Sequence, residues 1–343
     1  MWQVIGQNRA VSFLQRSLEK EMVAHAYLFV GPPHVGKMTL AINLAQALNC
    51  AAAEPPCGDC ASCQKIASFR HPDIQIIGLI SDSKSDGTRP RAEISIDQIR
   101  EMQHSGNLPP FEGRNKVFII DGAELLSNEA ANCLLKTLEE PVSGVVFILL
   151  TRNDRLLPAT VVSRCQRLEL LPLSAKVIEE VLQRQNSMIP KKAQLLARLC
   201  HGSIGWMFLA SADGKVLSLR DERLDRILDI INTDLEERFS YAGQLAKQFN
   251  QNRGQVQEIL DLWQDYWHDL LLVKAGRSDA VANIDRTDTI VDMAGEYRLA
   301  QVRAMISSIQ EAGEQLRQNV NPLLVLEVLM LDIPVGVNRT LAA

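Results

Sequence analysis

Hydrophobic positions in the first half of the chain form short, nearly continuous runs, and stretches with helical spacing separate these runs. Runs of this kind are typical of parallel strands that are buried on both faces of a sheet. They predict strands at residues 26–30, 74–80, 117–120, 145–150 and 167–170. The stretches between them predict helices at residues 35–48, 96–103 and 128–140. This alternation indicates an α/β fold built on a doubly wound parallel sheet.

Beyond residue 170 the strand pattern stops, and amphipathic helical patterns follow to the end of the chain. The last of these helices is marked by Asn321 as its N-cap and by Pro322 at its first position. We therefore expect an α/β core at residues 1–171, a small helical lid at 172–214 and an all-helical domain at 215–343.

Composition agrees with a folded protein of two or three domains, since the chain has 343 residues, of which 46% are hydrophobic and 22% charged. The net charge of −5 argues against a basic protein that coats DNA. There is no run of 18 apolar residues and no signal segment after Met1, so we expect a cytoplasmic protein without a membrane segment. A polar segment at residues 81–90 predicts a loop.

One short motif carries a specific chemical prediction. Residues 31–37 read G-P-P-H-V-G-K, which meets the phosphate-binding pattern G-x-x-x-x-G-K between a predicted strand and a predicted helix. In such a loop, backbone N–H groups hold the phosphates and the lysine reaches their oxygens. The candidate nucleotide-binding residues are Gly31, Pro32, Pro33, Val35, Gly36, Lys37, Met38, Thr39 and Asp121. A loop that no longer binds nucleotide is the alternative.

Residues that support ATP hydrolysis in such proteins are missing here. Met38 stands where Ser or Thr would bind Mg²⁺, and a thioether is a poor ligand for a hard cation. Thr39 comes one place late, about 100° further round the helix. Asp121 ends a predicted strand as a Walker B aspartate does, but Gly122 stands where a glutamate would activate water, and Glu124 should point elsewhere. We therefore expect binding of ATP or ADP at most.

Four of the seven cysteines, at positions 50, 57, 60 and 63, lie close together in the sequence. The thiolates of Cys50, Cys57, Cys60 and Cys63 can enclose a tetrahedral Zn²⁺ ion. Four protein ligands leave no position for a catalytic water, so the expected role is structural. An iron–sulfur cluster uses similar spacing, and free buried cysteines are the remaining alternative.

A second candidate for chemistry is Ser163-Arg164-Cys165, which follows the fourth predicted strand. Arg164 is either a structural ion-pair partner or a residue that reaches the γ-phosphate bound to a neighbouring subunit. An arginine supplied in that way stabilises the charge that develops in phosphoryl transfer. The spacing alone does not decide between the two roles.

Together these motifs resemble the delta prime family of clamp-loader subunits in bacterial DNA polymerase III, which belongs to the AAA+ class. The resemblance is densest in the first 170 residues. Besides the loop and the cysteines, it rests on Ile5-Gly6-Gln7, His71-Pro72-Asp73, Ser163-Arg164-Cys165 and residues 25–29, 96–100, 116–121 and 130–141.

The resemblance implies an AAA+ core, a lid, and a helical collar that joins this chain to delta and gamma/tau subunits in a hetero-pentameric ring. Such a ring opens the sliding clamp and places it on primer–template DNA. The resemblance also implies that Arg164 is an arginine finger acting in trans and that the four cysteines bind zinc. The chain would then be part of a DNA-directed DNA polymerase holoenzyme, with no ATPase activity of its own.

The ATP-hydrolysing gamma/tau motor subunit is the close alternative, because it shares the cysteine module and the Ser-Arg-Cys motif. Three residues argue against it: Met38, Gly122, and Gly205 where gamma/tau has its sensor-2 arginine. The chain also ends without the extension found in tau.

Overall fold

The computed structural model describes residues 1–79, 93–186, 189–212, 214–318 and 320–336. The predicted loop at 81–90 and the last residue of the strand predicted at 74–80 lie outside these ranges.

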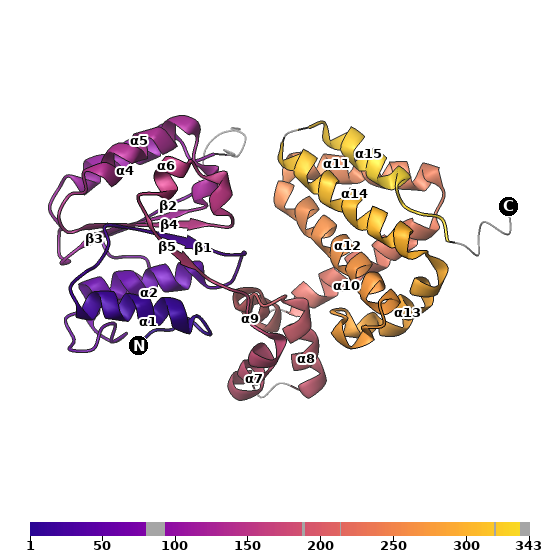
Figure 1. Ribbon diagram of the computed structural model, residues 1–343, viewed down its shortest axis with the longest axis horizontal. Helices are drawn as coiled ribbons and strands as arrows, with labels where there is room; N and C mark the ends of the chain where they lie inside the picture. Colours follow the sequence, from indigo (N-terminus) through magenta and orange to yellow (C-terminus); the bar gives the residue numbers. More distant parts are fainter. Residues whose placement is uncertain (80–92, 187–188, 213, 319, 337–343) are drawn as a thin grey trace. The chain divides into compact units, whose positions relative to one another are not determined.

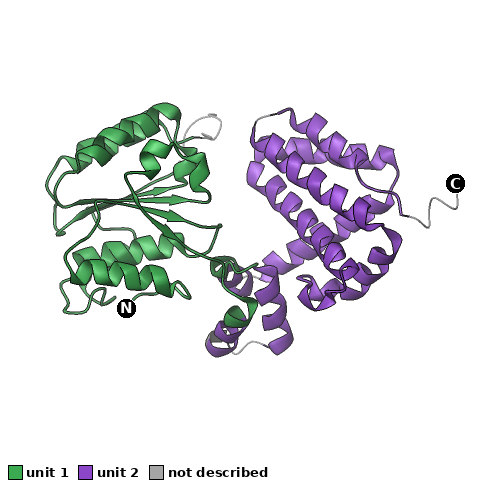
Figure 2. Ribbon diagram, in the orientation of Figure 1, with its two compact units in different colours: residues 1–178, 201–206 green, residues 179–200, 207–343 purple. Residues whose placement is uncertain are grey.

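The chain divides into two compact units (Figure 2). The first comprises residues 1–178 and 201–206, and the second comprises residues 179–200 and 207–343. Each unit has its own hydrophobic core. The finer division into core, lid and collar stays a prediction.

A sheet of parallel strands forms the centre of the first unit, in the order β2-β3-β4-β1-β5 (Figure 1). The strands are β1 Ala26–Val30, β2 Ile74–Ile77, β3 Lys116–Asp121, β4 Val145–Thr151 and β5 Gln166–Glu169. The inner strands β1, β3 and β4 are buried almost throughout, as their apolar runs predict. The edge strands β2 and β5 are largely exposed, because each has a partner strand on one side only. The predicted bounds of these two were wrong: β2 ends at Ile77, and β5 begins one residue early.

Side chains of the inner strands alternate between two hydrophobic clusters, because successive strand residues point to opposite faces. Tyr27 and Phe29 pack on the face covered by α1 and α2, whereas Leu28 and Val30 pack on the face covered by α4, α5 and α6. Figure 1 shows these two helical layers on either side of the sheet. The helices of the first unit are α1 Asn8–Glu19, α2 Lys37–Asn49, α3 Ala61–Ala67, α4 Ile96–Gly106, α5 Asn128–Glu139 and α6 Ala159–Val162. The doubly wound α/β prediction is therefore confirmed.

Two buried side chains hold the backbone that leads into β3. The carboxylate of Asp73 accepts hydrogen bonds from the backbone N–H groups of Phe111, Glu112 and Gly113, at 2.6, 2.9 and 2.8 Å. Asn49 Oδ1 accepts bonds from the next two backbone N–H groups, at 2.8 and 3.0 Å. These bonds satisfy five consecutive amides that no strand partner reaches, and they fix the start of β3.

Helices make up the second unit, and its core centres on α12. The predicted 3.6-residue pattern is confirmed there, since Val256, Leu260, Trp263 and Trp267 all lie in the hydrophobic core. The helices are α8 Pro190–Leu199, α10 Gly214–Asn232, α11 Leu235–Gln251, α12 Arg253–Lys274, α13 Thr287–Glu296, α14 Leu299–Arg317 and α15 Pro322–Leu331. Two more helices, α7 Ala175–Asn186 and α9 Ile204–Ala212, cross the boundary between the units.

The start of α15 follows its prediction as well. Asn321 is the N-cap and its Oδ1 accepts the N–H of Leu323 at 3.0 Å, while Pro322 takes the first helical position. None of the helices among the described residues is both long and apolar enough to cross a membrane.

Replacing Asp73 by Asn should lower the free energy of unfolding by about 2–3 kcal/mol, because a neutral amide accepts these three bonds less well than a carboxylate. Burial raises the pKa of Asp73, but the three backbone bonds outweigh burial and leave the pKa below its ordinary value of 3.8. The stabilisation is therefore present at neutral pH and is lost as the pH falls below that value. Urea unfolding at neutral and acidic pH measures both effects.

Asp97→Asn is the matched control, because the Asp97 side chain is exposed and pairs loosely with Arg100 at 3.7 Å. If both variants unfold like the wild type at neutral pH, Asp73 does not hold the start of β3.

Candidate nucleotide and metal sites

The predicted phosphate-binding loop lies directly after β1, and α2 begins at its lysine. Gly31 donates its N–H to the carbonyl of Thr151 at 3.1 Å, which extends the pairing of β1 with β4 into the loop. A Cβ atom on Gly31 would lie 2.5 Å from the carbonyl oxygen of Leu170, so only glycine fits there. Gly36 has φ +104, and His34 takes a left-handed φ of +58, where glycine is usually found.

The amine of Lys37 binds its own loop. Nζ donates to the carbonyl oxygens of Gly31 and Pro32 at 2.6 and 2.7 Å. Burial lowers the pKa of Lys37 to about 8, and nearby Arg152 lowers it further, while the carboxylates of Glu124 and Asp121 oppose the shift. Most of the Lys37 amine still carries its proton at neutral pH, but the amine loses that proton at a lower pH than an exposed lysine.

The other predicted nucleotide-binding residues are divided between the loop and the core. Val35 is fully buried, and Met38 packs into the hydrophobic cluster under α1 and α2. Thr39 is exposed on α2. Neither residue therefore brings a hydroxyl to the position that Ser or Thr occupies in an ATP-hydrolysing loop.

Asp121 ends β3, as predicted, and its carboxylate acts on Lys37. The prediction for Glu124 was wrong, because its negative charge acts on Lys37 more strongly than that of Asp121. Gly122 takes φ +76, and the turn that follows it, Ala123–Leu125, brings Glu124 back toward the loop. This left-handed turn was not visible as a pattern in the sequence.

Glu124 and Arg152 were both missed as site residues. The Glu124 side chain is only 9% exposed, and its Oε1 lies 3.9 Å from Arg152 Nε and accepts the Arg152 backbone N–H at 3.4 Å. Its other oxygen, Oε2, is buried and accepts no hydrogen bond from any described residue. Arg152 directly follows β4, the strand between β1 and β3. The carboxyl ends of parallel strands meet at one edge of a sheet. The position of Arg152 directly after a predicted strand could therefore have identified it as a residue of this site.

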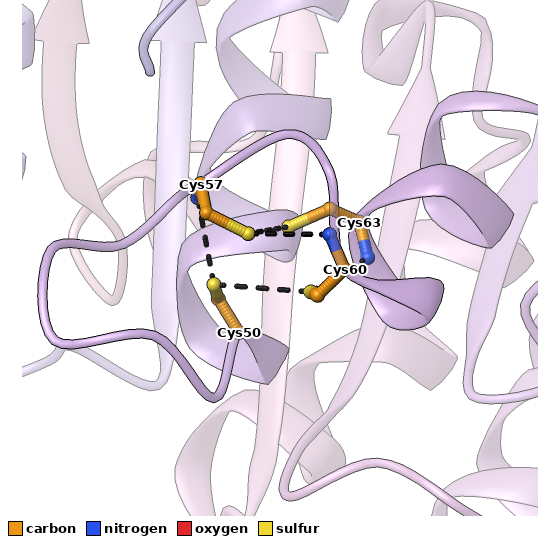
Figure 3. Close-up of side chains that lie close together, drawn as sticks. All are labelled: Cys50, Cys57, Cys60 and Cys63. Atoms are coloured by element: carbon orange, nitrogen blue, oxygen red, sulfur yellow. Dashed lines mark hydrogen bonds between the residues drawn. The ribbon is translucent and has the colours of Figure 1, made fainter.

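The four clustered cysteines come together where α2 ends and α3 begins (Figure 3). All four Sγ atoms lie within 4.8 Å of one another. The Cys50–Cys60 and Cys57–Cys63 sulfur distances are 4.0 and 3.9 Å, far too long for disulfides. Tetrahedral Zn–S bonds of about 2.3 Å place sulfurs roughly 3.8 Å apart. The cluster therefore fits a single metal ion.

Backbone N–H groups help to hold these sulfurs. The N–H of Cys60 donates to Cys57 Sγ at 3.3 Å, and that of Cys63 donates to Cys60 Sγ at 3.4 Å. Bonds from the backbone of Cys60 and Asp59 lower the pKa of Cys57 to about 6, whereas burial raises the pKa of Cys63 to about 12. Gly58 takes a left-handed φ of +86 between Cys57 and Cys60, where the chain turns. A bound cation would favour the thiolate form of all four ligands.

Arg164 lies on the surface between α6 and β5. Its Nη1 donates to the carbonyl of Thr160 at 2.9 Å, and its Nη2 donates to Glu139 Oε1 at 2.5 Å. The side chain is still 35% exposed. A surface ion pair of this kind contributes about 0–1 kcal/mol, so the guanidinium can exchange Glu139 for another anion at little cost. Neighbouring Cys165 is a packing residue, and burial raises its pKa to about 12.

This parallel strand order, with a phosphate-binding loop after β1 and an acidic residue at the end of β3, defines a P-loop protein of the AAA+ class. Residues 6–174 match the family model described as "DNA polymerase III, delta subunit", and residues 221–334 match the one described as "DNA polymerase III, delta subunit, C terminal". The chain therefore belongs to the delta-type clamp-loader family of DNA polymerase III subunits.

Curated relatives agree with this family. The chain is 29% identical to DNA polymerase III subunit delta' of Bacillus subtilis, over 96% of this chain and 97% of that protein. It is 28% identical to subunit tau of the same species over 96% of this chain, and 36% identical to subunit tau of Escherichia coli over 62% of this chain. The alignments cover only 60% and 33% of those tau proteins.

Solved structures similar to the chain include two from Thermotoga maritima. One is a DNA polymerase III gamma subunit-related protein, 15% identical over 94% of this chain and 98% of that one, with a TM-score of 0.41. The other is the RuvB Holliday junction branch migration motor, 17% identical over 94% and 87%, with a TM-score of 0.43.

Acylation of Lys37 should follow a pH curve with its midpoint at about 8. Only the neutral amine reacts, and an ordinary lysine loses its proton near pH ~10.4. Brief labelling across a range of pH, followed by mass spectrometry of the Lys37 peptide, gives this midpoint. Glu124→Gln should move it lower still, because the carboxylate that favours the charged amine is gone. A midpoint at the ordinary lysine value in both proteins would contradict the described burial of Lys37.

Cys60→Ser should abolish metal binding to the purified chain, measured by elemental analysis. Serine keeps the N-cap role of Cys60, whose side chain accepts the Cys63 N–H at the start of α3, so the change mainly removes a metal ligand. Cys133→Ser is the control, since Cys133 lies outside the cluster and bonds Gln103 instead. Equal metal content in the wild type and both variants would rule out the four-cysteine site.

Proposed function

We propose that this chain is a delta prime-type subunit of the clamp loader that does not hydrolyse ATP itself and supplies Arg164 to the ATP site of a neighbouring gamma/tau subunit. Family membership supports the first part of this proposal. The position of Arg164 relative to the chain's own phosphate-binding loop supports the second part.

That position is the observation that carries the proposal. In the parallel pair of β1 and β5, Val30 lies opposite Glu169, and Tyr27 lies opposite Gln166. The loop follows Val30, so it lies at the carboxyl edge of the sheet, whereas Arg164 precedes Gln166 at the amino edge. At about 3.3 Å per residue, the two edges are roughly 10 Å apart along the strands alone. Arg164 is therefore poorly placed for its own loop, and β5 is an edge strand that a neighbour can approach.

Three features of the loop region support the absence of hydrolysis. Met38 is partly buried and packs against the hydrophobic core, so this position offers no hydroxyl to a Mg²⁺ ion. Gly122 has no side chain to act as a base. A side chain at Gly205 would meet His34, since a Cβ there would lie 3.0 Å from the His34 carbonyl oxygen. The alternative, a gamma/tau-like motor, would have to use Glu124 in place of the missing glutamate.

We assign a structural Zn²⁺ ion to Cys50, Cys57, Cys60 and Cys63. The short sulfur–sulfur distances support a single ion, because a cluster of several irons would spread its thiolates further apart. The partners in this proposal are the delta and gamma/tau subunits of a hetero-pentameric ring, which acts on the sliding clamp and on primer–template DNA. The protein would then work in the cytoplasm.

Arg164→Ala should reduce the ATPase activity that DNA and clamp stimulate in the assembled complex, while this subunit still folds and assembles. Losing an arginine finger costs roughly 10³- to 10⁵-fold at one site, and the loss for the complex is smaller because other sites remain. Arg167→Ala is the matched control, because Arg167 is an exposed arginine on β5 that pairs with Asp154 and Glu169. ATPase activity equal in the two complexes would exclude the finger role.

The motor alternative is tested on the isolated chain. No ATP turnover above background is expected, with or without Mg²⁺. Turnover that disappears in Lys37→Ala and in Glu124→Gln would reject the non-hydrolysing role and favour the motor.

A further inference from the structure

Residues 2–7, which precede α1, pack on the core of the first unit, and we call them the N-terminal segment. Trp2 and Val4 are partly buried against the hydrophobic cluster under α1 and α2. At the end of the segment, Gln7 Nε2 donates to the carbonyl of Leu171 at 2.8 Å, and Gln7 Oε1 accepts the Leu171 N–H at 3.3 Å. Gln7 therefore attaches this end of the segment to the residues that follow β5.

Two buried amide side chains of α2 hold the other end of the segment. The backbone N–H groups of Gln3 and Val4 donate to Asn43 Oδ1 at 2.7 and 3.3 Å. Asn43 Nδ2 donates to Gln46 Oε1 at 3.1 Å, and Gln46 Nε2 donates to the carbonyl of Cys63 at 2.9 Å. We call Asn43 and Gln46, which are 1% and 2% exposed, the amide network. Its bonds connect the N-terminal segment to the cysteine cluster.

The hydrogen bonds of the amide network all run in one direction, from the N-terminal segment toward Cys63. Each side-chain amide accepts at its oxygen and donates from its nitrogen, so the bonds polarise one another. Because both side chains are buried, a broken bond would leave a polar atom without a partner and without water, which is unfavourable. The bonds of the network are therefore expected to form together and to break together.

Cys63 belongs both to this network and to the candidate metal site. Its Sγ is one of the four clustered sulfurs, while its backbone carbonyl is the acceptor for Gln46. The residue is fully buried near the start of α3. A bound metal ion would fix its sulfur against the other three. A second contact joins the same parts of the chain, since the ammonium group of Met1 donates to the carbonyl of Pro56 beside the cysteines.

We propose that the four-cysteine metal site controls how firmly the N-terminal segment is attached to the core, and that the amide network carries this effect. With the metal bound, Cys63 has a fixed position, and Gln46 and Asn43 hold the backbone of the segment. Without the metal, α3 loses this restraint, the bond from Gln46 to Cys63 weakens, and the segment opens at the end opposite Gln7. This proposal deepens the metal assignment and rests on it.

Hydrogen–deuterium exchange of the purified chain tests the coupling, and the readout is the N-terminal peptide that reports the amides of Gln3 and Val4. Removing the metal with a chelator should speed exchange of these amides about two- to tenfold, the effect of losing one neutral hydrogen bond. Gln46→Met keeps a side chain of similar volume but removes its amide. The variant should show a similar increase while its metal content stays that of the wild type. Chelation should then add less in this variant than in the wild type.

Gln103→Met is the matched control. Gln103 also joins two helices through its amide, since Nε2 donates to the carbonyl of Cys133 and to Thr137 Oγ1 at 2.8 and 2.7 Å. It lies on α4, which covers the opposite face of the sheet, so exchange of the N-terminal peptide should stay at the wild-type rate. Peptides from β1 and β3 reveal whether chelation unfolds the whole unit. In that case, the comparison of Gln46→Met with Gln103→Met, both loaded with metal, still decides.

Three results would overturn the proposal at different steps. A wild-type chain without bound metal in elemental analysis removes the metal assignment and the coupling with it. A wild-type chain that loses its metal to the chelator without any change in N-terminal exchange contradicts the coupling but leaves the metal site. Wild-type exchange in metal-loaded Gln46→Met contradicts the role of the amide network. The role of Arg164 is measured separately, in the assembled complex.

Discussion

Parallel pairing of β1 with β4 and β5 is the constraint on which the other features of the first unit depend. Because all strands run the same way, everything that follows a strand gathers at one edge of the sheet, and everything that precedes a strand gathers at the other. The loop after β1, Asp121 at the end of β3 and Arg152 after β4 therefore share one edge. Arg164 precedes β5 and lies at the opposite edge. This separation is what the proposed function needs, with the loop at one edge and an arginine for a neighbouring subunit at the other.

The backbone of the loop and the side chains around it set different properties of the loop. Its glycines are required by the backbone, since Gly31 approaches Leu170 and Gly36 takes a left-handed φ. These requirements hold whether or not a phosphate binds, so the pattern G-x-x-x-x-G-K alone does not establish nucleotide binding. The surroundings of the pattern differ from those of a hydrolysing loop: Met38 packs against the core, and the charges of Glu124 and Arg152 act on Lys37. These neighbours decide what the amine binds.

The cysteine cluster depends on local geometry rather than on the sheet. Its four ligands fall within a short stretch that turns at Gly58 and ends in the first turn of α3. Backbone N–H groups three residues further along the chain bond the sulfurs of Cys57 and Cys60, and all four thiols lie at distances that suit one ion. Such a site can form wherever these residues occur together, and four protein ligands agree with a structural rather than a catalytic role.

The sequence by itself determined the α/β class, the inner strands, the amphipathic α12 and the cysteine site, because each depends on residues near one another in the chain. Apolar runs as long as β1 and β4 can be buried in few other ways, and four cysteines at this spacing lie close together in any compact turn. The predicted bounds of β2 and β5 were wrong, because edge strands are largely exposed and carry a weaker apolar pattern. Only the tertiary structure brought Glu124 and Arg152 to Lys37. Those contacts join residues from separate elements, and the left-handed turn at Gly122 and the strand order that create them leave no periodic signal in the sequence.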